Sequence, residues 1–295
     1  MNSVNKIIIL RSKIRNHQNK SLFLTLRDKM KKLLFAIVSL VSTAGFSTGV
    51  IVLEGNYQGK NLYVQNPFAG SGVGFCVQEV RVNGNVTTDE IASSAFEIDF
   101  RNLQLKLGDK VEVKITHKDD CKPKVLNPEV LKPKSTFEVT SMIVDKDLTF
   151  KWATKGETGK LTYTIEQFRW NKWVKVGEVE GNGTPDENNY SFKVSPHSGK
   201  NQYRVKQVDY TGQPKVSKTV DFTSTSPEIS FSPAKVSKEI TFTAGSTPTE
   251  TMFEIYDQFG NIVKRGFASV VDASNLPKGA YYLNYDNKMG EFIKK

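Results

Sequence analysis

Residues 96–115 read FEIDFRNLQLKLGDKVEVKI, and this stretch decides the fold class. Apolar side chains occupy every second position over 96–100, 103–107 and 111–115, and Gly108 separates the second run from the third. A period of two with one apolar face is typical of antiparallel strands that pack on one side. We therefore expect three strands here and an all-β fold.

The residues around this stretch extend the same pattern over 50–134. About six short runs of this kind lie within that range, which favours an N-terminal β-sandwich. Asn83-Gly84 predicts a two-residue hairpin, because both residue types tolerate the positive φ of a type I′ turn. The segment 122–133 is too rich in proline for a central strand, so we expect a linker or a sheet edge.

A second unit, 135–224, carries strand patterns every 10–14 residues, with Trp152 early and an aromatic late. This pattern is typical of an immunoglobulin-like sandwich. Trp152, Glu157 and the series Tyr203-Arg204-x-Lys206-Gln207-x-Asp209-x-x-Gly212 resemble the fibronectin type III-like module that often precedes sorting domains in exported proteins of Bacteroidota. The resemblance implies a spacer or interaction module, with no catalytic residues to carry over.

Aromatic residues gather in the middle of this second unit. Tyr163, Phe168 and Trp170 are the candidate binding surface, for a sugar or a peptide. Residues 168 and 170 share one face of a strand, and an exposed aromatic cluster marks an interaction site. The alternative places Trp173 in the core and leaves Trp170 half exposed without a binding role.

Residues 253–295 read FEIYDQFGNIVKRGFASVVDASNLPKGAYYLNYDNKMGEFIKK. The order of turns and aromatic strands resembles the C-terminal sorting domain (type A) of cargo of the Bacteroidota type IX secretion system. We expect this domain, a third β-sandwich, over 225–295. The residues that carry the resemblance are Tyr256, Gly260, Leu276, Pro277, Gly279, Tyr281, Lys294 and Lys295.

The resemblance implies export. The expected partners are the Sec translocon and the type IX secretion translocon, with passage through the periplasm to the cell surface or the medium. The segment Phe231–Ala234 departs from the family's entry motif, because the Pro-Asn that normally precedes Pro233-Ala234 is missing. This departure leaves open whether the C-terminal domain is cleaved or retained as a docking module.

The other end of the chain predicts the same route. From Met30 it reads MKKLLFAIVSLVSTAGFSTG, a basic start followed by an apolar run and small residues, which is typical of a secretory signal peptide. The run Leu33–Val41 is too short for a membrane span, which needs about 20 residues. We expect a leader over 1–49, with 1–29 an upstream extension, 30–49 the signal peptide, and cleavage after Gly45 or Gly49.

The leader also holds most of the positive charge. The chain has 41 basic and 31 acidic residues, of which nine basic and one acidic lie in 1–49, so 32 and 30 remain. A strongly basic protein often binds nucleic acid or anionic membranes. The near-neutral charge of residues 50–295 argues against a nucleic-acid partner. We expect no transmembrane span in these residues.

The two cysteines, Cys76 and Cys121, both follow the leader. An even number of cysteines in an exported chain favours a disulfide. The alternative is a metal site, since His117, Asp119 and Asp120 lie beside Cys121. We expect the disulfide, no metal and no cofactor.

Catalytic motifs are missing from the chain. After the leader only His117 and His197 remain, far apart in the sequence, and we expect His197 on an exposed hairpin tip. No nucleophile elbow, zinc-protease motif or phosphate loop occurs. The sequence predicts a non-enzymatic secreted or cell-surface protein that binds a protein or a glycan. The alternatives are a retained accessory or signalling component of the type IX machinery and an accessory module of a secreted hydrolase.

Overall fold

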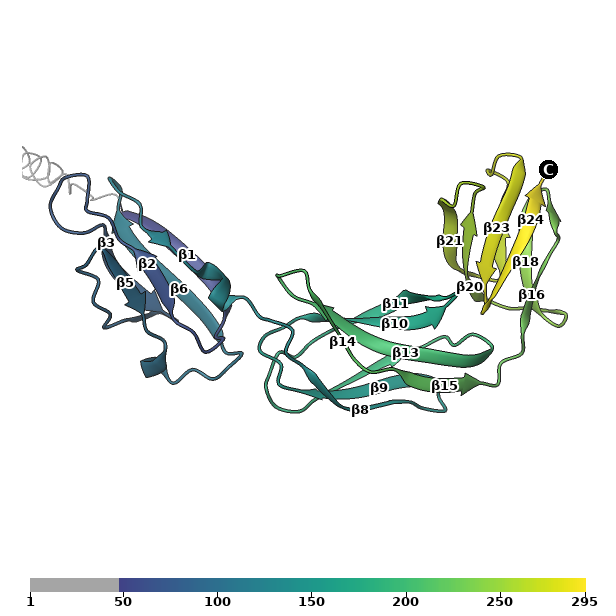
Figure 1. Cartoon of the computed structure of the whole chain (residues 1–295), viewed down its shortest axis with the longest axis horizontal. Coiled ribbons are helices and arrows are strands. Elements are labelled where there is room, and N and C mark those ends of the chain that lie inside the picture. Colours follow the sequence, from purple (N-terminus) through teal and green to yellow (C-terminus); the bar gives the residue numbers. More distant parts are fainter. Residues whose placement is uncertain (1–47) are drawn as a thin grey trace, which may run out of the picture. The chain divides into compact units, whose positions relative to one another are not determined.

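The computed structural model describes residues 48–295 (Figure 1). These residues form strands almost throughout, interrupted by two short 3-10 turns, η1 (Arg101–Leu103) and η2 (Pro128–Leu131). The expected all-β fold of tandem sandwiches is confirmed. No helix in the described part is long and apolar enough to span a membrane. The upstream extension 1–29, Met30 and the apolar run of the leader lie outside the described residues.

The N-terminal sandwich packs a four-stranded sheet, in the order β1-β6-β3-β4, on a three-stranded sheet, β5-β2-β7. Their inward residues include Leu62, Ile98 and Ile115, all fully buried. The strands are β1 (Thr48–Asn56), β2 (Leu62–Gln65), β3 (Val77–Val82), β4 (Asn85–Val86), β5 (Ala95–Ile98), β6 (Lys110–Lys118) and β7 (Lys124–Val125).

Turn chemistry explains one correct and one wrong prediction in this sandwich. Asn83 and Gly84 have φ of 50° and 84° and join β3 to β4, which confirms the type I′ hairpin. The strand expected over 103–107 is wrong, because η1 ends in a left-handed Gln104 with φ 54°. Leu103 and Leu105 still pack against the core, so the apolar alternation reflects burial of a loop.

The middle sandwich packs the sheet β12-β9-β8 on the sheet β11-β10-β13-β14, with β15 also paired to β13. Its core is aromatic: Trp152 lies 5.1 Å from Phe150 and 5.8 Å from Tyr163 between ring centroids. The strands are β8 (Glu138–Val144), β9 (Thr149–Lys155), β10 (Thr162–Arg169), β11 (Lys172–Glu180), β12 (Asn188–Lys193), β13 (Gly199–Val208), β14 (Pro214–Val216) and β15 (Val220–Ser224).

The C-terminal sandwich places its last strand inside a sheet. The five-stranded sheet has the order β17-β24-β23-β20-β21, and the facing sheet joins β16, β18, β19 and β22. The strands are β16 (Ile229–Ser232), β17 (Lys235–Val236), β18 (Glu239–Ala244), β19 (Thr247–Pro248), β20 (Thr251–Tyr256), β21 (Ile262–Ala268), β22 (Val270–Asp272), β23 (Gly279–Tyr285) and β24 (Lys288–Lys294). Each of the three sandwiches has its own cluster of buried apolar side chains.

Candidate functional site

One of the three residues of the candidate aromatic surface lies in the interior of the sandwich. Tyr163 is fully buried, on the inward face of β10 with Ile165, so it cannot contribute to an exposed surface. Its hydroxyl lies 3.0 Å from Glu157 Oε1. Burial raises the pKa of Tyr163 far above its usual range. The phenol therefore keeps its proton and donates to the carboxylate.

Phe168 and Trp173 lie on the outward face of the β10–β11 hairpin, and Trp170 is half-buried at its turn, as the alternative expected. Trp170 and Asn171 form its turn, with φ of 50° and 59°, and this turn pairs Phe168 directly with Trp173. The two rings meet edge to face at 5.3 Å, and the guanidinium of Arg204 lies 4.0 Å from the ring centroid of Trp173. The expected core position of Trp173 is therefore wrong, because a two-residue turn puts its two flanks on one face.

A buried carboxylate organises the interior of the middle sandwich. Glu157 is 2% exposed. Its oxygens accept hydrogen bonds from the hydroxyls of Thr154, Tyr163 and Tyr190 and from the backbone N–H of Gly183. All lone pairs of a buried carboxylate need donors, and here the donors come from three separate strands and a loop. The cluster therefore ties these strands and the loop together inside the sandwich.

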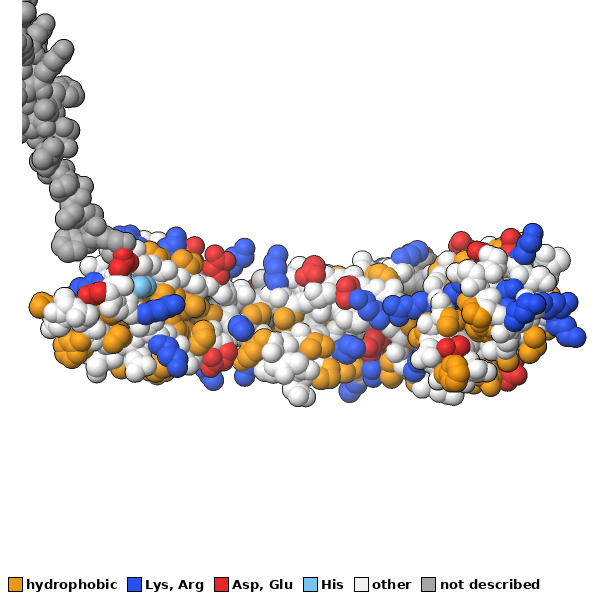
Figure 2. Space-filling model, turned by 90° about the horizontal axis from the view of Figure 1, so that it is seen from above, with side chains coloured by type: hydrophobic (Ala, Val, Ile, Leu, Met, Phe, Trp, Pro, Cys, Tyr) orange, Lys and Arg blue, Asp and Glu red, His pale blue; other side chains and the backbone are white. Residues whose placement is uncertain are grey.

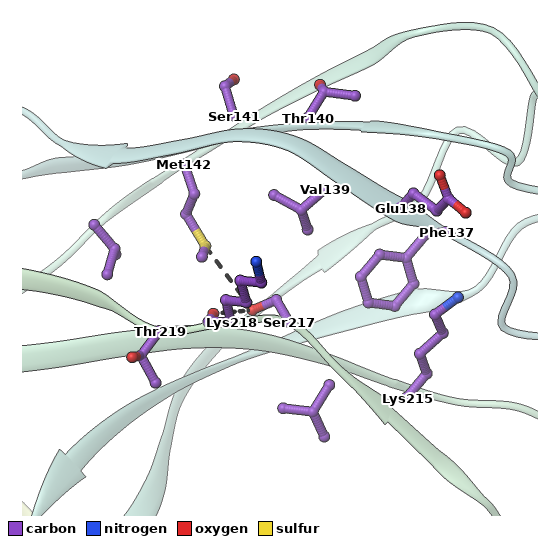
Figure 3. A pocket seen from close by; sticks show the side chains of 12 residues that line it. Phe137, Glu138, Val139, Thr140, Ser141, Met142, Lys215, Ser217, Lys218 and Thr219 are labelled. Atoms are coloured by element: carbon purple, nitrogen blue, oxygen red, sulfur yellow. Dashed lines mark hydrogen bonds between the residues drawn. The ribbon is translucent and has the colours of Figure 1, made fainter.

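The middle sandwich is open along one side, where two edge strands face each other (Figure 3). We call the cavity of about 490 Å³ between them the seam groove. One wall is β8, the edge of its sheet, and the other is the segment 215–220 that spans β14 and the start of β15. The groove joins segments far apart in the sequence, and no sequence motif marks it. Its lining residues are Phe137–Met142 and Lys215–Val220.

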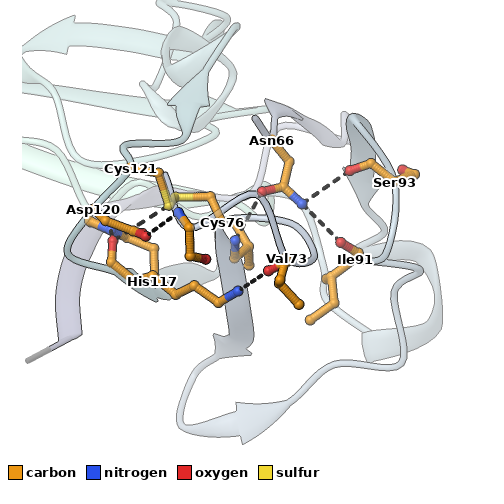
Figure 4. The surroundings of a disulfide bond; sticks show 11 residues. Asn66, Val73, Cys76, Ile91, Ser93, His117, Asp120 and Cys121 are labelled. Atoms are coloured by element: carbon orange, nitrogen blue, oxygen red, sulfur yellow. Dashed lines mark hydrogen bonds between the residues drawn. A yellow bond between two sulfur atoms is a disulfide. The ribbon is translucent and has the colours of Figure 1, made fainter. Parts of the chain in front are cut away.

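The expected disulfide is present in the N-terminal sandwich (Figure 4). Cys76 and Cys121 are bonded, with Cα atoms 5.8 Å apart. This bond takes Cys121 out of the alternative metal site, and His117 points its Nδ1 to the carbonyl of Lys118 at 2.8 Å. No group of three His, Cys, Asp or Glu residues within 48–295 lies close enough to hold a metal ion.

The disulfide fixes the base of a loop that ends in exposed apolar side chains. Phe68 and Val73 are 63% and 75% exposed. Buried Asn66 holds the other side of the loop, since its amide donates to the carbonyls of Ile91 and Ser93 and its oxygen accepts the N–H of Val77. Apolar side chains form small separate patches on the face in Figure 2, and single exposed apolar residues are normal on protein surfaces.

The residues of the sorting-signal resemblance mostly build the C-terminal sandwich itself. Leu276 and Tyr281 are 9% and 6% exposed, and the Tyr281 ring stacks on Phe292 at 5.3 Å. Gly260 and Gly279 have φ of 82° and 150°, which favours glycine. Pro277 and Lys295 are exposed, Tyr256 is half-buried, and Lys294 is 8% exposed.

The turn between β23 and β24 makes buried contacts with the middle sandwich. Asp286 is 1% exposed, and its carboxylate accepts the backbone N–H of Ser198 at 2.9 Å and the Ser198 hydroxyl. Asn287 donates to the Ser198 carbonyl at 3.0 Å. His197 is 6% exposed, and burial lowers its pKa. The exposed position expected for His197 is wrong, because the turn between β23 and β24, with Asp286, lies beside it.

A second polar contact joins the same two sandwiches. Lys172 donates to Glu254 at 2.6 Å and to the hydroxyl of Tyr256 at 2.8 Å. The Glu254 side chain is 10% exposed. Although its burial opposes ionisation, the bonds from Lys172 and Tyr256 hold its pKa below the usual range. Sequence reasoning missed Ser198, Asp286 and Glu254, because their partners lie more than 80 residues away.

No family model matches the chain, and no curated protein matches it. Solved structures with some similarity include a tetra-tandem repeat from the extending region of a large adhesion protein, at 12% identity over 84% of this chain and 73% of that chain, with a TM-score of 0.29. The chicken CNTN1 FN1–FN3 domains share 12% identity over 84% of this chain and 98% of theirs, with a TM-score of 0.25. The central fibronectin-III array of RIM-binding protein shares 10% identity over 55% of this chain and 68% of that chain, with a TM-score of 0.20. At these scores the similarities carry no functional assignment.

Proposed function

We propose that the chain is a non-enzymatic binding protein exported by the type IX secretion system, which acts at the cell surface or in the medium. Its tandem sandwiches would present binding surfaces for a protein or a glycan. The C-terminal sandwich would be the sorting domain.

The placement of the sorting-signal residues carries this proposal. Leu276 and Tyr281 belong to the core of one sandwich, and β24 runs to Lys294 at the end of the chain. Because these apolar residues are required for the fold, the proposed signal would be a folded surface and not a linear tag. The bond between Cys76 and Cys121 supports the route, because disulfides persist in oxidising compartments.

Export should depend on the C-terminal sandwich. In a bacterium with an active type IX system, deletion of 225–295 is expected to leave the protein in the periplasm, whereas the whole chain reaches the surface or the medium. Deletion of 50–134 is the control and should leave export intact, since it removes a sandwich without the signal. Cell fractionation and immunoblotting measure the outcome. Export of the chain without 225–295 would contradict the proposal.

A second candidate function is a retained component of the secretion machinery, and the contacts of Asp286 favour it. A domain that is discarded after transport needs no buried polar contacts with its neighbour. Here Asp286 satisfies the N–H and the hydroxyl of Ser198, and Arg169 donates to the Asp286 carbonyl at 3.4 Å. Burial lowers the pKa of Arg169 to about 10, so it remains charged at neutral pH. Mass spectrometry of the exported protein separates the two candidates by the presence or loss of 225–295.

The docking of the two sandwiches should depend on Asp286. Asp286→Ala leaves the N–H of Ser198 buried without an acceptor, which costs about 1–3 kcal/mol. We expect the backbone N–H of His197, which is buried at this contact and bonded to Asn201, to exchange its hydrogen about tenfold faster in this variant, since 1.4 kcal/mol is a factor of ten. Glu291→Ala removes an exposed acid of the same sandwich and should not change the rate. An unchanged rate in Asp286→Ala would show that the carboxylate does not hold the sandwiches together.

A further inference from the structure

The seam groove exists because the chain leaves the sheet between β14 and β15. Ser217 donates its N–H to the Val205 carbonyl at 2.9 Å, as in a regular ladder. The N–H of Val205, however, donates to the Ser217 hydroxyl at 3.0 Å, so a side chain replaces the backbone carbonyl as acceptor. Residues 217–219 are therefore not part of a strand, and toward β8 the segment is joined through side chains, with the Ser217 hydroxyl 3.9 Å from the sulfur of Met142 (Figure 3).

The floor of the groove is apolar. A bulge at Thr140 puts both Val139 and Met142 on the inward face of β8, where they pair with Thr154 and Trp152 of β9. Val139, Met142 and Val220 are half-buried and pack against the core. A ligand that covers the remaining apolar surface of these side chains stabilises the complex by about 25 cal/mol per Å² removed from water.

Both walls of the groove offer backbone hydrogen-bonding groups. β8 is paired on one side by β9, and β14 is paired on one side by β13. The N–H and C=O groups of an unpaired strand edge can bind another extended chain. The bulge in β8 restricts regular pairing to a short length, which suits a peptide of a few residues better than a whole sheet edge.

The rim of the groove is basic. Lys215 and Lys218 lie on one wall, and Glu138 is the single acidic residue that lines the groove. None of these three side chains takes part in an ion pair among the described residues. The Lys215 amine lies 5.4 Å from the ring centroid of Phe137. Two unpaired cations against one acid favour a ligand that carries a carboxylate.

We propose that the seam groove binds an extended acidic peptide of a partner protein. The peptide lies along the edge of β8, inserts an apolar side chain over Val139 and Met142, and presents an Asp or Glu to Lys215 and Lys218. A glycan fits less well, because sugars stack on exposed aromatic rings and Phe137, the aromatic residue of the groove, is 2% exposed. This inference specifies the ligand of the proposed binding function and rests on that function.

The peptide class can be tested by selection from a displayed library of random linear dodecapeptides. The target is the purified chain with its disulfide formed, and the counter-target is the Lys215→Glu/Lys218→Glu variant. We expect enriched sequences in which apolar residues alternate with polar ones and include Asp or Glu. No enrichment over the counter-target would overturn the proposal, and so would enrichment of basic sequences.

The binding constant of the best selected peptide then locates the site. Fluorescence anisotropy should show at least about tenfold weaker binding to Lys215→Glu/Lys218→Glu. Lys146→Glu is the matched control, because Lys146 is exposed in the same sandwich outside the groove, and it should change the binding constant less than about twofold. Equal loss in both variants would reveal a general charge effect and overturn the site. Unchanged thermal unfolding of each variant verifies that the fold is intact.

Hydrogen exchange distinguishes strand addition from contact elsewhere. The peptide should protect the amides of Phe137–Met142, and exchange in β12, at the far edge of the same sheet, should not change. Protection elsewhere would overturn the proposed pose. A glycan array that binds the chain but not the double variant, together with a failed peptide selection, would assign the groove to a sugar. Export is measured separately, so a failed selection leaves the sorting-domain proposal standing and a failed export test leaves the groove standing.

Discussion

Glu157→Ala is expected to lower the free energy of unfolding of the middle sandwich by about 3–5 kcal/mol, as for other losses of a buried polar partner. The carboxylate accepts bonds from the hydroxyls of Thr154, Tyr163 and Tyr190, and its removal leaves these groups buried without an acceptor. Burial raises the pKa of Tyr163 and Tyr190 well above the usual range. The phenols therefore keep their protons and remain donors without an acceptor.

Tryptophan fluorescence reports this change directly. All three tryptophans of the chain lie in the middle sandwich, at positions 152, 170 and 173. A urea titration followed at the tryptophan emission should show the midpoint shift. Glu178→Ala is the control, because the Glu178 side chain is 50% exposed in its pair with Lys175, and exposed pairs contribute about 0–1 kcal/mol. A shift in Glu157→Ala no larger than the control's would contradict the role of the buried carboxylate.

Loss of the disulfide is expected to destabilise the N-terminal sandwich by about 3–4 kcal/mol. The bond closes a loop with a sequence separation of 45, and the chain-entropy model gives about this cost when the unfolded chain is released. Cys76 is fully buried and directly precedes β3, the strand that pairs with β6. Cys76→Ser/Cys121→Ser should therefore unfold this sandwich at lower urea concentration.

Chemical reduction is a second way to remove the disulfide, because the chain has only these two cysteines. A thiol reductant can act on this bond alone, so wild type with reductant should behave like the double serine variant. Far-ultraviolet circular dichroism follows the strands of all three sandwiches, so an earlier transition should appear in it, and tryptophan emission of the middle sandwich is the internal control that should not move. If reduction leaves both transitions unchanged, the disulfide contributes little to the fold.

The sequence predicted the structure correctly where neighbouring residues decide the backbone conformation. Asn83-Gly84 formed the expected hairpin because both residue types tolerate the positive φ that the turn requires. The run 111–115 became part of β6 because both its alternation and its length fit a strand. The run 103–107 has the same alternation and became a loop. Alternation reports which side chains are buried, and a loop that lies on a core satisfies it equally well.

The burial of side chains whose partners lie far away in the sequence was not predicted correctly. Trp173 was misplaced because its face follows from a turn that had to be two residues long. His197 was misplaced because Asp286 lies beside it and binds the adjacent Ser198, and Asp286 is 88 residues from Ser198 in the sequence. A polar residue looks solvent-exposed in a sequence until the donor or acceptor that permits its burial is known.

The sequence by itself determined that this protein is a tandem of β-sandwiches and that Cys76 and Cys121 are bonded, because strand periodicity and cysteine pairing are visible in the residue types. Only the tertiary structure decided where its surfaces are. The Glu157 cluster, the contacts of Asp286 and the seam groove each unite residues from separate strands. Their geometry depends on how sheets end and pack, and neither hydrophobic pattern nor composition encodes where two sheet edges fail to meet.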